Sequence, residues 1–158
     1  LSGSLPTELA LLRSLERLYI SSFNGLAGTI PTEYGKLKNM QSLTLSGDLT
    51  GPIPTELGKL EKLRTLRLSA NELTGTIPTE LGNLKSLESL FLENNDLDGT
   101  IPRELGQLKA MTILSVKKND QLYGPVPQEV CENMPIWLMY GCGVKCECTR
   151  GCDEPCTP

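Results

Sequence analysis

Apolar residues return along the chain at a nearly fixed period, and an apolar residue followed by proline marks each return. The six pairs are Leu5-Pro6, Ile30-Pro31, Ile53-Pro54, Ile77-Pro78, Ile101-Pro102 and Val126-Pro127. Their prolines are 25, 23, 24, 24 and 25 residues apart. A repeat of this length predicts a solenoid, in which each unit packs only against the units beside it.

The spacing of apolar residues changes within each unit. After Pro54, leucines follow at +3, +6, +9, +12 and +14. The steps of three place side chains on one face of a short helical turn, and the final step of two is that of a strand. Strands of stacked units would then form one parallel sheet. The expected strands are Leu18–Ile20, Leu43–Leu45, Leu66–Leu68, Leu90–Leu92 and Leu114–Val116.

A polar residue follows each expected strand. Its side chain can hydrogen-bond the backbone of a tight buried turn that no sheet ladder satisfies. We therefore expect a structural ladder made of Asn24, Asp48, Asn71, Asn95 and Asn119.

The stretch from Leu66 to Pro78, LRLSANELTGTIP, resembles the plant-type leucine-rich repeat LxLxxNxLxGxIPxxLGxL. This repeat is found in plant receptor-kinase ectodomains and polygalacturonase-inhibiting proteins, and the resemblance covers residue 1 to about residue 140. It implies an α/β solenoid: a right-handed leucine-rich-repeat superhelix with a concave parallel β-sheet and short 3-10 or helical turns on the convex side. It also implies extra short strands around Leu-x-Gly-x-Ile-Pro.

All six cysteines lie in the last part of the chain, at Cys131, Cys142, Cys146, Cys148, Cys152 and Cys156. We divide the single domain into repeats over 1–130 and a cysteine-rich cap over 131–158, because the apolar end of a solenoid needs a cover. The tail is similar to the cap of secreted leucine-rich-repeat proteins from diatoms and related algae. An even cysteine count favours three disulfides, with 15 possible connectivities, and an extracellular location. The alternative is a zinc site of the last four cysteines, whose spacing differs from that of paired CxxC knuckles.

Composition narrows the function. The 158 residues carry a net charge of −4 and contain no histidine, which excludes Ser-His and Cys-His catalysis. We find no nucleophile-base pair and no cofactor motif, and so expect no catalytic residue, no metal and no cofactor. The acidic balance argues against nucleic acid as a partner, and no run approaches the roughly 18 apolar residues of a membrane helix. The chain opens inside a repeat, so we expect a missing N-terminal cap.

Ligand-binding candidates are the strand residues that point away from the core. The central column holds Tyr19, Thr44, Arg67, Phe91, Ser115 and, if the cap keeps register, Tyr140. Aromatic residues beside basic ones are typical of a binding hot spot for a protein or peptide. The candidates on the concave face are Tyr19, Arg64, Arg67, Phe91, Glu93, Ile113, Lys117, Lys118, Trp137 and Tyr140.

Other interpretations stay open. The cysteine tail could fold over Trp137, Leu138 and Tyr140 and make them the core of the cap. Arg64 and Arg67 could pair with Glu88 and Glu93 as solvated cross-strand charges. The glutamates at +2 of each unit, a possible acid array, suit the exposed N–H groups of a helical turn.

A non-protein ligand is the alternative function. Threonines flank the Ile-Pro turns as partial ladders on the convex side, at Thr29, Thr76 and Thr100 and at Thr32, Thr55 and Thr79. A regular threonine array could bind ice, and the concave face could instead bind a cell-wall polysaccharide.

Overall fold

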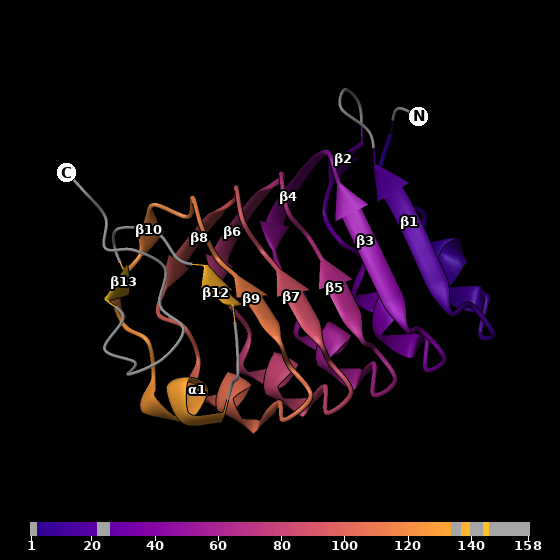
Figure 1. Ribbon diagram of the computed structural model, residues 1–158. Coiled ribbons are helices and arrows are strands. Elements are labelled where there is room, and N and C mark those ends of the chain that lie inside the picture. The colour runs from indigo at the N-terminus through magenta and orange to yellow at the C-terminus, as the bar shows by residue number, and fades with distance from the viewer. Residues whose placement is uncertain (1–2, 22–25, 134–136, 140–143, 146–158) are drawn as a thin grey trace.

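Each sequence repeat forms one coil of a solenoid (Figure 1). The computed structural model describes residues 3–21, 26–133, 137–139 and 144–145. Strands from successive coils lie side by side, all parallel, in the order β1-β3-β5-β7-β9-β12. We call this six-stranded sheet the concave sheet. Its strands are β1 (Arg17–Ser21), β3 (Ser42–Ser46), β5 (Thr65–Arg67), β7 (Ser89–Phe91), β9 (Ile113–Ser115) and β12 (Trp137–Met139).

A second parallel sheet follows the concave sheet in every coil, just before the Ile-Pro turn. Its strand order is β10-β8-β6-β4-β2. The strands are β2 (Ala27–Gly28), β4 (Asp48–Pro52), β6 (Glu72–Thr76), β8 (Asp96–Gly99) and β10 (Gln121–Leu122), and a separate pair joins β11 (Gly124–Pro125) to β13 (Val144–Lys145). The extra short strands implied by the plant-type repeat are thus present.

Short 3-10 helices begin directly after the prolines. They are η1 (Thr7–Leu11), η2 (Thr32–Lys36), η3 (Thr55–Lys59), η4 (Thr79–Asn83) and η5 (Arg103–Gln107), and the last coil has α1 (Gln128–Asn133) in their place. Each preceding proline is extended, as in Pro54 with φ −64° and ψ 129°. A 3-10 helix has three residues per turn, which accounts for the steps of three in the sequence.

The core runs through the whole solenoid as a stack of leucines. Leu57, Leu60 and Leu63 from the turn side and Leu66 and Leu68 from the strand side are all fully buried. The coils that begin at Pro31, Pro78 and Pro102 contribute equivalent sets, so each covers apolar surface of the coil beside it. In the first coil, the corresponding Leu9, Leu15, Leu18 and Ile20 are only partly buried. The fold is therefore a leucine-rich-repeat solenoid with short 3-10 turns, as the sequence predicts.

Three buried asparagines tie neighbouring coils together after the strands. Asn95 donates from Nδ2 to the carbonyls of Leu68 (2.9 Å) and Leu92 (3.0 Å), and its Oδ1 accepts from the N–H of Leu73 (3.1 Å). Asn71 and Asn119 make the equivalent bonds. Each side chain thus satisfies backbone groups of two coils.

Asp48 is not a member of this ladder, contrary to the sequence expectation. It is exposed and begins β4. Leu49 N–H donates to Asn71 Oδ1 (3.3 Å), as Leu73 N–H does to Asn95. Asp48 therefore occupies the place of exposed Glu72, and its 23-residue unit lacks the ladder residue. Asn24 lies outside the described residues.

The register of the last strand also differs from the expectation. Trp137 pairs with Ile113, Leu138 with Leu114 and Met139 with Ser115. Met139, rather than Tyr140, therefore continues the central column. The last coil turns through α1 and reaches its strand one residue sooner than the coil before it. Tyr140 lies outside the described residues.

Candidate ligand-binding face

The central column of the concave sheet is in register across five strands. Tyr19 pairs with Thr44, Thr44 with Arg67, Arg67 with Phe91, and Phe91 with Ser115. Tyr19 is 75% exposed and Ser115 only 1%, whereas Arg67 and Phe91 between them are half-buried. The column thus passes from an exposed aromatic residue to a buried serine.

Arg67 and Phe91 form one stacked unit. The guanidinium carbon of Arg67 lies 3.8 Å from the centroid of the Phe91 ring. A guanidinium over an aromatic face is attracted by the ring and keeps its edge free for hydrogen bonding in the plane. The pair therefore presents an ordered donor group at the middle of the sheet.

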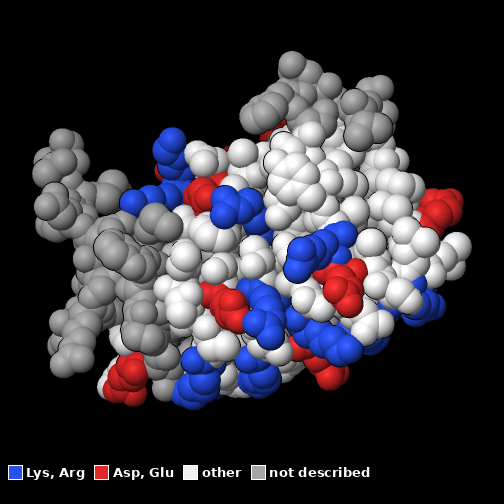
Figure 2. All heavy atoms as spheres, turned by 45° about the vertical axis from the view of Figure 1, so that its right-hand side comes forward, with Lys and Arg blue, Asp and Glu red and all other residues white. Residues whose placement is uncertain are grey.

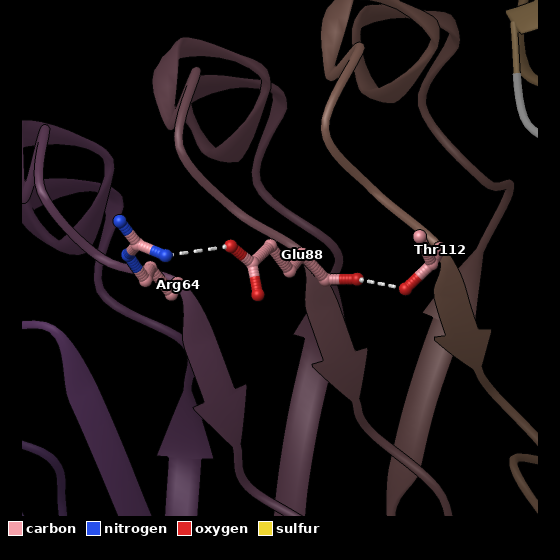
Figure 3. A network of polar contacts seen from close by, with 3 residues as sticks. All are labelled: Arg64, Glu88 and Thr112. Carbon is pink, nitrogen blue, oxygen red and sulfur yellow. Dashed lines mark hydrogen bonds and ion pairs between the residues drawn. The ribbon is translucent and has the colours of Figure 1, made fainter.

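Arg64, just before β5, forms an ion pair with Glu88, just before β7 in the next coil. Arg64 Nη1 and Glu88 Oε1 are 3.1 Å apart, with side chains 63% and 48% exposed. The Oγ1 of Thr112 donates to the Glu88 carbonyl at 3.1 Å, so the contacts span three coils (Figure 3). At this exposure the ion pair contributes little to stability.

The second expected cross-strand pair does not form. Arg67 stacks on Phe91, and no ion pair joins it to Glu93. Glu93 instead has a buried Oε2 with no hydrogen-bond partner among the described residues.

Glu93 belongs to a second column of outward residues, two positions after the central column in each coil. From this column the sequence pattern suggested only Glu93 and Lys117 as candidates. The column holds Ser21, Ser46, Ser69, Glu93 and Lys117. Ser46 Oγ donates to Ser21 Oγ at 3.0 Å. Ser69 is 8% exposed, and its Oγ has no partner in the described structure. Reading every outward position by its distance from the proline would have found Ser69.

The remaining candidates lie toward the last coils. Ile113 and Lys117 are half-buried, and Lys118 is exposed in a left-handed turn with φ 54°. Trp137 has a defined strand register beside Ile113, and its side chain lies outside the described part. The five cysteines from Cys142 to Cys156 lie outside the described residues. The expectation that the tail covers Trp137, Leu138 and Tyr140 concerns the same part of the chain and stays a prediction.

The convex turns satisfy their own polar groups. The hydroxyls of Thr32, Thr55 and Thr79 lie 3.3–3.4 Å from the carboxylates of the glutamates that follow them. Lys38 Nζ donates to the Lys59 carbonyl (2.8 Å), and Lys85 Nζ donates to the Gly82 carbonyl (2.7 Å). Basic and acidic side chains are interspersed on the surface in Figure 2. The described residues contain no metal-binding group of three or more His, Cys, Asp or Glu side chains.

The chain belongs to the leucine-rich-repeat family. The sequence pattern of the family described as "Leucine rich repeat" matches residues 38–97 and 61–120, together more than half of the chain. No curated protein matches. None of the described helices is long and apolar enough to cross a membrane.

Solved structures of plant leucine-rich-repeat proteins share the fold. A plant peptide hormone receptor, RGFR1, in complex with RGF2 is 34% identical, with a TM-score of 0.85 over 92% of this chain. A plant ice-binding protein is 35% identical, with a TM-score of 0.82 over 92%. The Arabidopsis receptor kinase HAESA, in complex with the peptide hormone IDA and the co-receptor SERK1, is 30% identical, with a TM-score of 0.82 over 96%. The chain spans 23%, 46% and 30% of the lengths of these three proteins.

Proposed function

We propose that this chain is an extracellular, non-catalytic recognition module whose concave sheet binds a protein or peptide. The observation that carries the proposal is the Arg67–Phe91 stack at the centre of the outward side chains of the concave sheet. Stacking orders both side chains before a ligand arrives, so little conformational entropy is lost on docking. The likeness to ectodomains solved with peptide hormones supports the same assignment.

A cysteine cap over residues 131–158 completes this proposal. Cys131 is disulfide-bonded and packs, partly buried, against the core. Disulfides persist in oxidising compartments, which supports an extracellular location. The cap would cover the apolar end of the stack beyond β9.

A phage-displayed library of random peptides tests the proposal. We expect peptides to be enriched on the wild-type protein and lost on Phe91→Arg, which replaces the stacked ring with a second cation beside Arg67. Thr79→Arg, an exposed change on the convex turn η4, is the matched control and should keep binding. Equal enrichment on Phe91→Arg and the wild type would contradict the proposal.

Ice is a second candidate ligand, favoured by the likeness to a plant ice-binding protein. Thr29, Thr76 and Thr100 are exposed on the second sheet side. The second set of threonines, Thr32, Thr55 and Thr79, argues against ice binding, because their hydroxyls lie within hydrogen-bond distance of the adjacent glutamate carboxylates. Thermal hysteresis of the wild-type protein, abolished by Thr76→Leu, would support ice binding, and its absence would exclude it.

A further inference from the structure

Two buried polar atoms on the concave face lack a partner within the described part of the chain. They are Ser69 Oγ and Glu93 Oε2. Ser69 is 8% exposed, so bulk water does not readily solvate its hydroxyl. Buried polar groups of native proteins are almost always paired, and an unpaired one lowers stability. An external hydrogen-bond partner is one explanation for such a group.

The two residues lie just beyond the ends of strands β5 and β7, in adjacent coils. Arg67 pairs with Phe91, and two residues further on the Ala70 N–H donates to the Glu93 carbonyl at 3.0 Å. Ser69 and Glu93 therefore lie side by side, and strand alternation places them on the same face as Arg67 and Phe91. The same column is paired at its other end, where Ser46 bonds Ser21. The unpaired groups thus belong to the two central coils, whose strands carry Arg67 and Phe91.

The chemistry of this cluster selects a neutral ligand group. Glu93 Oε2 can only accept a hydrogen bond from a ligand, and the Arg67 guanidinium can only donate one. Their charges cancel, so neither a cation nor an anion is favoured. A hydroxyl or a carboxamide both donates and accepts, and so can bond Glu93 and Arg67 together.

We propose that Ser69, Glu93 and Arg67 form a subsite for a Ser, Thr, Asn or Gln side chain of an extended peptide. This inference rests on the proposed function and names the chemistry that the concave face recognises. The peptide side chain donates to Glu93 Oε2, accepts from the Arg67 guanidinium, and exchanges a hydrogen bond with the Ser69 hydroxyl.

The test uses the same random-peptide library on the whole protein. We expect one fixed position of the enriched peptides to be rich in Ser, Thr, Asn and Gln. Binding of the enriched peptide should weaken about tenfold or more on Ser69→Ala and on Glu93→Leu. Glu93→Gln keeps a carbonyl acceptor of the same shape and should weaken binding less than Glu93→Leu. Glu80→Leu, an exposed glutamate on the convex turn η4 of the same coil, is the control and should leave binding unchanged.

The melting temperature separates a binding role from a structural one. Ser69→Ala removes a hydroxyl that has no partner, so it should melt at the wild-type temperature or above it. A clear fall in melting temperature would show that the fold uses this hydroxyl and would overturn the subsite.

The other outcomes distinguish the two proposals. Peptide binding that survives Ser69→Ala and Glu93→Leu but is lost on Phe91→Arg overturns the subsite and leaves the proposed function standing. No enrichment on the wild-type protein overturns both. Glu93-dependent binding of a neutral oligosaccharide such as cellohexaose, without peptide enrichment, would assign the cluster to sugar hydroxyls and overturn the peptide assignment.

Discussion

Buried polar groups are hydrogen-bonded in the turns of the solenoid, whereas two on its concave side have no partner among the described residues. In the turns, polar groups are bonded from coil to coil: Asn95 bonds backbone groups of two coils, and Lys38 donates to the Lys59 carbonyl of the next coil. On the concave sheet, Ser69 and Glu93 keep buried atoms unpaired within the described structure. The turns therefore stabilise the stack, and the unpaired groups lie beside the sheet that we propose binds the ligand.

The largest effect is expected from Asn95→Ala. The change leaves the buried Leu73 N–H without its acceptor and removes one of the two amide donors of the Leu68 and Leu92 carbonyls, which keep Asn71 and Asn119. At about 1–3 kcal/mol for the N–H and about 1 kcal/mol for each lost carbonyl hydrogen bond, we expect a loss of roughly 4 kcal/mol, measured by urea unfolding. Asp96→Ala, the exposed neighbour, should change stability by less than about 0.5 kcal/mol. Equal effects of the two variants would refute the ladder's structural role.

Gly82→Ala should be nearly as damaging. A Cβ at this position would lie 2.6 Å from the backbone oxygen of Glu104 in the next coil, so two 3-10 turns would have to separate. Overpacking of this kind costs about 3 kcal/mol. Gly75→Ala is the comparison: its φ is +74°, but its Cβ would meet only Pro52 at 3.9 Å, and the backbone strain alone is about 1–2 kcal/mol. Thermal unfolding in the reverse order would show that close approach of the coils is not limiting.

Tyr34 gives the turn side a pH dependence. Burial, with a smaller contribution from the charge of Glu8, raises the pKa of Tyr34 to about 12, and its hydroxyl donates to the Pro6 carbonyl at 3.2 Å. The folded state holds this proton more tightly than the unfolded state, so its contribution is fully present below pH 10 and is lost as pH rises toward 12. We expect a loss of about 2 kcal/mol across this window. Subtracting the profile of Tyr34→Phe isolates the effect, and parallel profiles would exclude it.

The smallest effect is expected on the concave face. Glu88→Gln removes an exposed ion pair with Arg64 and should lower stability by less than about 0.5 kcal/mol. Urea unfolding at low and high salt measures this change. A loss above about 1 kcal/mol would mean that the concave face contributes to stability as the turns do.

The periodicity of the sequence predicts the solenoid and its strands because backbone and core share one repeat. Leu57, Leu60 and Leu63 follow the three-residue turn of a 3-10 helix, and the expected strand Leu66–Leu68 overlaps β5. Asp48 was placed wrongly because a polar residue after a strand does not reveal that one position is missing. The shift of the last strand has a similar cause, since an α-helical turn cannot be told from a 3-10 turn by leucine spacing.

Less of the candidate binding face can be predicted from the sequence. Arg67 and Phe91 stand in adjacent coils of one column, which follows from the repeat. Whether Arg67 stacks on Phe91 or pairs with Glu93 depends on side-chain rotamers that the repeat does not determine. The sequence does not distinguish Ser69 from the other serines that point outward, and only the structure shows that Ser69 is buried. Which of these residues contact a ligand stays a prediction.

Backbone amide chemical shifts, followed by NMR while the library-enriched peptide is added, distinguish binding on the concave sheet from binding on the convex turns. We expect the shifts to change most on β5 and β7 and at Ser69 and Glu93, while η3 and η4 on the convex side stay unchanged. Shifts confined to the 3-10 turns, with β5 and β7 unaffected, would contradict binding on the concave sheet.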